Sequence, residues 1–186
     1  AMYTNIPDQK TLSVQILGMS SKRAPDGPAQ KLTTIRQRLV EGNYTDALRL
    51  CEEGQKNFPS HNGFLQLTGE TQLAMGNVEA AKSAFQRSIK LNAKDKSSHS
   101  SLANLYFDLG KYVYAALSFS DVIFLDPDDS DSRYMQGLSY FKAKEWGRAA
   151  AAWEDLLYYK PDNEVVRVLL HQTYYILAIE YNRLGN

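Results

Sequence analysis

The sequence offers few of the side chains on which catalysis and metal binding depend. It contains one cysteine, Cys51, and three histidines, His61, His99 and His171. A single cysteine cannot form an internal disulfide, and the histidines stand at no metal-ligand spacing that would suggest a shared site. No histidine lies close to Cys51 in the chain, so an activated cysteine nucleophile is not expected. We therefore predict that the protein is not an enzyme and holds neither a metal nor another cofactor.

An excess of charge of either sign is also missing. Lysine and arginine together number 21, as do aspartate and glutamate, so the formal net charge is zero. Without a basic field there is little to attract a nucleic acid, and no apolar run approaches the roughly 20 residues of a membrane-spanning helix. We expect a soluble chain with no nucleic-acid partner and no membrane span, in the cytoplasm or the periplasm.

What the sequence does contain is a repeat. An alanine recurs every 34 residues at four positions: Ala47, Ala81, Ala115 and Ala149. Five residues before it stands a glycine in three copies and a lysine in the fourth: Gly42, Gly76, Gly110 and Lys144. Four residues after it stands a cysteine or a large aromatic residue: Cys51, Phe85, Phe119 and Trp153. A small contact residue, a large apolar one a turn later and a regular period are typical of a helical hairpin repeated in tandem.

This pattern resembles the tetratricopeptide repeat family over roughly residues 28–186. The resemblance implies an all-α fold, a right-handed superhelical solenoid of antiparallel helix pairs. It divides the chain into an extended N-terminal segment, four repeats and a long terminal helix: residues 1–27, 28–61, 62–95, 96–129, 130–163 and 164–184. The first copy departs most from the family, because Ile35 stands where the later copies have a small residue: Gly69, Ala103 and Gly137.

The residues also predict where each helix lies. Glycine ends the first helix of each pair by tolerating left-handed backbone, and Val78, Ala81, Phe85 and Ile89 form one apolar stripe along a second helix. Because alanine lets the paired helices approach, a large side chain there should cost about 1–3 kcal/mol through overpacking. We expect first helices near residues 29–41, 61–75, 95–109 and 129–143. We expect second helices near residues 44–57, 77–91, 111–124 and 145–158.

The two ends of the sequence differ from the repeats. Leu12, Val14 and Ile16 alternate with polar residues, which is the pattern of a strand or an extended peptide. Residues 1–27 are therefore either a flexible leader or a built-in ligand for the groove of the same or a neighbouring chain. At the other end, residues 164–170 lengthen the fifth first helix by about two turns. That helix either caps the stack or belongs to a longer solenoid, and its many tyrosines favour an interface.

In the family, partners bind the concave face that the first helices form. Members that hold the acidic tails of heat-shock chaperones use lysine, arginine and asparagine at positions that here read as follows: Leu32, Arg36, Leu67, Ser97 and Ser101. That carboxylate clamp is absent, so the resemblance implies an apolar or aromatic peptide or helix as the ligand. The expected groove residues are Arg36, Leu39, Glu70, Leu73, Asn104, Phe107, Tyr134, Phe141 and Tyr175.

The function that follows is a protein–protein interaction module. We predict that its concave groove binds a segment of a partner protein and that the chain is an adaptor in the assembly of a protein complex. The alternative is a structural or oligomerising scaffold segment of a larger solenoid, with the N-terminal segment occupying its own or a neighbour's groove. A homo-oligomer is compatible with both hypotheses.

Overall fold

The computed structural model describes residues 27–185, and these residues form nine helices and no strand. The helices follow one another with short connections, and their bounds are α2 (Pro28–Val40), α3 (Tyr44–Asn57), α4 (Gly63–Ala74), α5 (Val78–Leu91), α6 (Lys96–Asp108), α7 (Tyr112–Leu125), α8 (Ser130–Lys142), α9 (Trp146–Tyr159) and α10 (Glu164–Arg183). Every predicted helix is present, and each end lies within two residues of the predicted range. The pattern noted at Leu12 to Ile16 lies outside the described residues.

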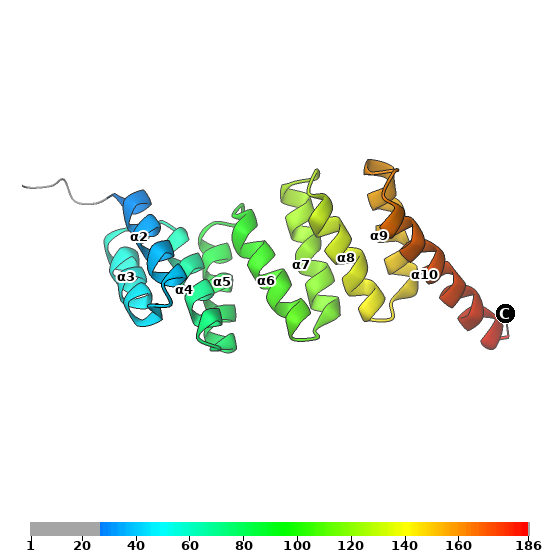
Figure 1. The fold of residues 1–186 in the computed structure, drawn as a ribbon, viewed down its shortest axis with the longest axis horizontal. Helices are drawn as coiled ribbons and strands as arrows, with labels where there is room; N and C mark the ends of the chain where they lie inside the picture. The colour runs from blue at the N-terminus through cyan, green and yellow to red at the C-terminus, as the bar shows by residue number, and fades with distance from the viewer. Residues whose placement is uncertain (1–26, 186) are drawn as a thin grey trace, which may run out of the picture.

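The helices stack into an elongated all-α solenoid, with α2 at one end and α10 at the other (Figure 1). Each helix packs on its neighbours in the chain, so that α2 and α3, α4 and α5, α6 and α7, and α8 and α9 form four successive hairpins. The first helices α2, α4 and α6 also contact one another along the stack. The first helices therefore line one side of the solenoid, and the second helices form the other.

The recurring alanines lie where the helices of a hairpin touch. Ala47, Ala81, Ala115 and Ala149 are all completely buried, as are Cys51 and Trp153 four residues after two of them. The large side chains four residues after the alanines pack against small residues of the first helix. A methyl group at Gly69 would lie 2.4 Å from the ring of Phe85, and one at Gly137 would lie 2.7 Å from Trp153. The predicted small-against-large contact is therefore what brings the two helices of these hairpins together.

The turn inside each hairpin requires left-handed backbone. Gly42, Gly76 and Gly110 end their helices with φ of +74°, +80° and +70°, a conformation that glycine adopts without steric cost. In the fourth hairpin Lys144 occupies the equivalent position and adopts the same conformation, with φ of 61°. The fold thus keeps the turn geometry even where the glycine is missing.

Hydrogen bonds between side chains join one hairpin to the next. The amide of Asn62, before α4, donates to Asp95, before α6, over 2.8 Å. Lys96 at the start of α6 donates to Asp126 over 2.7 Å and to Asp129 over 3.1 Å, both near the start of α8. These contacts lie at one edge of the solenoid and fix the spacing of the first helices there.

Candidate functional site

All nine predicted groove residues lie on first helices, but the structure places them in different environments. Leu39, Leu73, Phe107 and Phe141 are half-buried at equivalent positions of α2, α4, α6 and α8, where they pack against the core. Phe107 stacks edge-on against Tyr112 with ring centroids 5.3 Å apart, and Phe141 against Trp146 at 5.1 Å. These four side chains help to close their own hairpins, so only part of each is available to a ligand.

The polar groove residues are more accessible. Arg36 and Asn104 are exposed on α2 and α6, whereas Glu70 on α4 accepts a hydrogen bond from the Gln66 amide over 3.0 Å. The same amide donates to Ser97 on α6 over 2.5 Å. Gln66 therefore joins α4 to α6 on the first-helix side. This hydrogen bond between helices was not predicted from the sequence.

Tyr175 has a different environment from its equivalents. The start of α10 keeps the 34-residue register, because the cap at Asn163 repeats the cap at Asp129, so the extra length of α10 lies at its C-terminal end and not at residues 164–170. Tyr175 therefore corresponds to Phe141, yet it is 70% exposed, because the described residues contain no second helix after α10 that could cover it. Three further apolar residues of α10 are open on the same side: Val165, Val168 and Ile179, exposed by 62%, 54% and 49%. We call these four residues the α10 face, and spacings of three, seven and four residues place them on one stripe of the helix.

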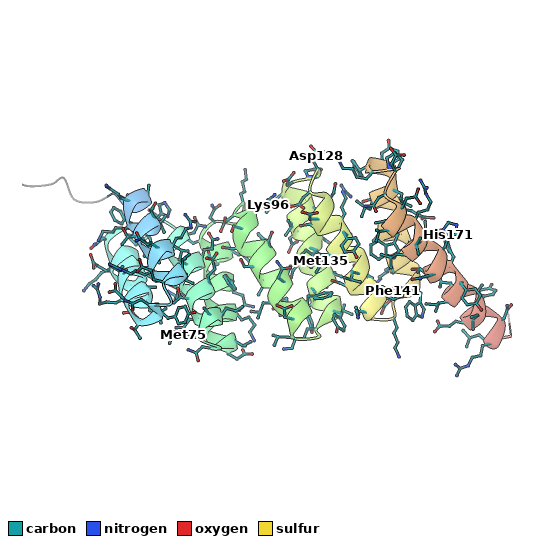
Figure 2. The ribbon with its side chains drawn as sticks, viewed as in Figure 1. Met75, Lys96, Asp128, Met135, Phe141 and His171 are labelled. Carbon is teal, nitrogen blue, oxygen red and sulfur yellow. The ribbon has the colours of Figure 1, made fainter. Side chains whose placement is uncertain are left out.

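On α8 the following helix, α9, covers the side chains that correspond to the α10 face, whereas no described helix follows α10. Tyr134 on α8 corresponds to Val168, and its ring lies 5.6 Å from that of Trp153 on α9. Figure 2 shows Phe141 on α8 and His171 on α10. Sequence reasoning selected Tyr175 but missed Val165 and Val168, although their spacing with Tyr175 and Ile179 is a signal that the sequence contains.

The opposite stripe of α10 is firmly held by α9. Val166 and Thr173 are completely buried, and Leu169 and Leu170 pack against Trp153 and Leu156. The hydroxyl of Tyr174 donates to the Glu154 carboxylate of α9, and this hydrogen bond raises the pKa of Tyr174 above its usual value. The α10 face is thus presented by a helix whose other side is fixed.

The surroundings of Cys51 decide the chemical character of its thiol. Its side chain is completely buried, and burial raises the pKa of the thiol to about 11. The thiol is therefore protonated at neutral pH and behaves as a small apolar core residue. In the part of the chain that the structure describes, no group of three or more His, Cys, Asp or Glu side chains is placed to hold a metal ion.

Across residues 27–185, no helix has both the length and the apolar content that crossing a bilayer requires.

The fold and the open surfaces define a class of protein: a helical repeat protein whose exposed faces are made by stacking hairpins. Within that class, the tetratricopeptide repeat model matches residues 67–130 and 101–164, which together span more than half of the chain. The chain belongs to the tetratricopeptide repeat family, and it is a protein-interaction module of that family.

Solved structures agree on the fold. The chain is similar to MamA from Desulfovibrio magneticus RS-1, with 17% identity, a TM-score of 0.68 and coverage of 84% of this chain and 88% of that one. It is similar to TTC0263, a tetratricopeptide repeat protein of Thermus thermophilus, with 19% identity, a TM-score of 0.60 and coverage of 89% and 96%. The first tetratricopeptide domain of Spaghetti (RPAP3), bound to an HSP90 peptide, has 18% identity, a TM-score of 0.51 and coverage of 63% and 95%. No curated protein matches the sequence.

Proposed function

We propose that this protein binds an apolar or aromatic segment of a partner protein on its first-helix side, with the α10 face as the main contact. The observation that carries this proposal is the exposure of Val165, Val168, Tyr175 and Ile179 in one row. Tyrosine offers a large contact area at low conformational cost, and aromatic anchors of this kind dominate binding energies in protein interfaces. An amphipathic helix laid along this row would place its own apolar residues between them.

The composition of the first helices argues for an apolar ligand over an acidic tail. RPAP3 binds an HSP90 peptide, but the corresponding clamp positions of this chain supply one cation, Arg36, instead of a set of them. Leu32 and Leu67 occupy two of these positions and are buried, and Ser97 occupies another. Arg36 on α2 and Asn104 on α6 remain exposed, and they would add specificity for a partner segment that extends from α10 along the first-helix side.

The binding test uses a phage-displayed library of random peptides as the probe, selected on the full chain. We expect selected peptides to carry apolar or aromatic residues at spacings of three and four. The double variant Tyr175→Ala and Ile179→Ala should weaken a selected peptide about 10- to 100-fold, as loss of hot-spot side chains does. Phe107 and Phe141 are poorer test positions, because their hairpin contacts mix stability with binding.

The matched control is Tyr158→Ala on α9, which removes a tyrosine that is 83% exposed outside the α10 face. Its affinity for the peptide should equal that of the unaltered chain. Equal weakening by the control, or unchanged binding by the α10 double variant with normal helicity, contradicts the proposal.

A chain lacking residues 1–26, measured beside the full chain, tests the alternative: stronger peptide binding without this segment indicates that it occupies the groove. An adaptor built on this site would join the partner segment to a second protein.

A further inference from the structure

A second open apolar surface lies on α7, on the second-helix side of the solenoid. Its members are Val113, Tyr114, Leu117 and Phe124, exposed by 38%, 61%, 51% and 85%. We call them the α7 stripe, since their spacing places all four on one side of the helix. The exposed carboxylate of Asp121, four residues after Leu117, lies on the same side. From Val113 to Phe124 the stripe is about 16 Å long. The buried side of α7 is built from other residues: Ala115, Ala116, Phe119 and Val122.

The repeat itself does not require this stripe. Leu117 corresponds to Arg49 on α3, Ser83 on α5 and Ala151 on α9. Phe124 likewise corresponds to a lysine in the first two hairpins and a tyrosine in the fourth: Lys56, Lys90 and Tyr158. The first two hairpins therefore fold with polar residues at both of these positions. A face of this kind on one helix of a repeat protein marks an interaction surface.

Charged groups of opposite sign stand at the two ends of the α7 stripe. Beside Val113, a hollow of about 310 Å³ is lined by Lys111 and Ala143 among others, and Lys144 follows directly in the chain. Within the described residues, neither lysine forms an ion pair. Beyond Phe124 the chain turns through Asp126, which is paired with Lys96, and Asp128, which is exposed. Figure 2 shows Asp128 at the edge where α7 ends, opposite the edge that holds Met75.

This arrangement is complementary to itself. A two-fold axis across the middle of α7 would lay the α7 helices of two copies antiparallel, with Val113 of one copy against Phe124 of the other. The basic end of each stripe would then meet the acidic end of its counterpart, and the two helix dipoles would oppose one another favourably. A closed two-fold contact of this kind uses the same patch on both chains. The zero net charge of the chain leaves no overall repulsion between copies.

From the apolar stripe and its charged ends, we infer that the occupant of the α7 stripe is a second copy of this chain, docked antiparallel through α7. The dimer is independent of the proposed peptide site, because α7 is a second helix and the α10 face belongs to the first-helix row. Both copies would keep their first-helix sides open. The assembly would therefore present two partner-binding sites, and a partner with two segments would be held by both.

The test is sedimentation equilibrium of the full chain over a wide concentration range. We expect a monomer–dimer equilibrium, and Leu117→Glu should weaken it at least ten-fold, because the substitution replaces an apolar contact by a second carboxylate one turn from Asp121. The matched control is Ser83→Glu, the same substitution at the equivalent position of α5. It should dimerise as the unaltered chain does. Circular dichroism of both variants should show unchanged helicity, since Leu117 is half exposed and Ser83 is exposed.

Charge exchange tests the antiparallel direction. Lys111→Glu and Asp128→Lys should each weaken the dimer, and the double variant should recover at least part of the loss, because it restores opposite charges across the seam. A monomer at every concentration overturns the inference. So does a dimer that Leu117→Glu leaves intact, or one that Tyr175→Glu abolishes, since the latter result would move self-association to the α10 face. Loss of dimer with peptide binding retained separates this inference from the proposed function.

Discussion

At the scale of single residues, the first hairpin reverses the sizes used by the others. The later hairpins place a small residue on the first helix against a large ring on the second, as with Gly69 and Phe85. The first hairpin places Ile35 on the first helix and Cys51 on the second, and both are completely buried in one cluster. The volume shared by the two positions is thus retained although its distribution is inverted, as close packing demands.

This compensation predicts strong coupling between Ile35 and Cys51. Cys51→Phe alone should lower the free energy of unfolding by about 1–3 kcal/mol through overpacking, and Ile35→Ala alone by about 2–5 kcal/mol through the cavity it leaves. The double variant should lose less than the sum, by about 0.5–3 kcal/mol, because the ring fills the vacated space. Urea unfolding of all four proteins measures the coupling.

The control for this cycle pairs residues from different hairpins. Ile35→Ala combined with Phe119→Leu should be additive, because the two side chains belong to separate clusters. Additive losses for the Ile35 and Cys51 variants would show that the inverted pair is not compensating. Both departures fall in the same copy of the sequence, and the structure places the two side chains in one buried cluster.

At the scale of helices, the sequence predicted where each helix begins and ends. It did not predict which side chains a neighbouring helix covers. The 34-residue period sets the helix ends, because the glycines that stop the first helices are themselves periodic. The period does not say which neighbour covers a side chain. Phe107 and Phe141 were predicted as groove residues, and the structure shows them half-covered by Tyr112 and Trp146 of their own hairpins. The same position on α10 is open because, among the described residues, no helix follows it.

The end of α8 offers a prediction about helix termination. Lys144 adopts φ of 61° where three other hairpins have glycine, and left-handed backbone costs a residue with a side chain about 1 kcal/mol or more. Lys144→Gly should therefore raise the free energy of unfolding by up to about 1 kcal/mol, after allowing for the entropy that glycine gains in the unfolded chain. Thermal unfolding should show a higher midpoint.

A neighbouring lysine supplies the comparison. Lys142→Gly makes the same chemical change inside the last turn of α8, where glycine is unfavourable by about 1 kcal/mol. It should lower the midpoint, so the two substitutions should have opposite signs. Loss of stability in both variants would show that the side chain of Lys144 makes a contribution larger than its backbone strain.

At the scale of the whole molecule, the solenoid has a graded stability. Each hairpin contacts only its neighbours, so stability is a sum of local terms and interfaces. Central hairpins have two such interfaces and terminal elements have one. The end of α10 is also exposed, with Tyr181 in its last turn and the following Leu184 open by 62% and 77%. Elements at the ends should therefore open more readily than those in the middle.

Hydrogen exchange measures this gradient directly. We expect the slowest amide exchange in α5 to α8 and the fastest in residues 177–183 of α10, with α2 between them. The measurement belongs at low protein concentration, so that any dimer through α7 does not add protection. Uniform exchange along the chain would indicate that the solenoid opens as one cooperative unit and would contradict the prediction.

The inverted pair of Ile35 and Cys51 also limits how the gene for this chain can be rearranged. A duplication or deletion of a complete hairpin carries both members of a size pair together. A crossover that falls between the two helices would join Ile35 to a large ring, or a glycine to Cys51, and the product would have a clash or a void. Recombination among these repeats is therefore expected to be tolerated at hairpin boundaries and selected against within hairpins.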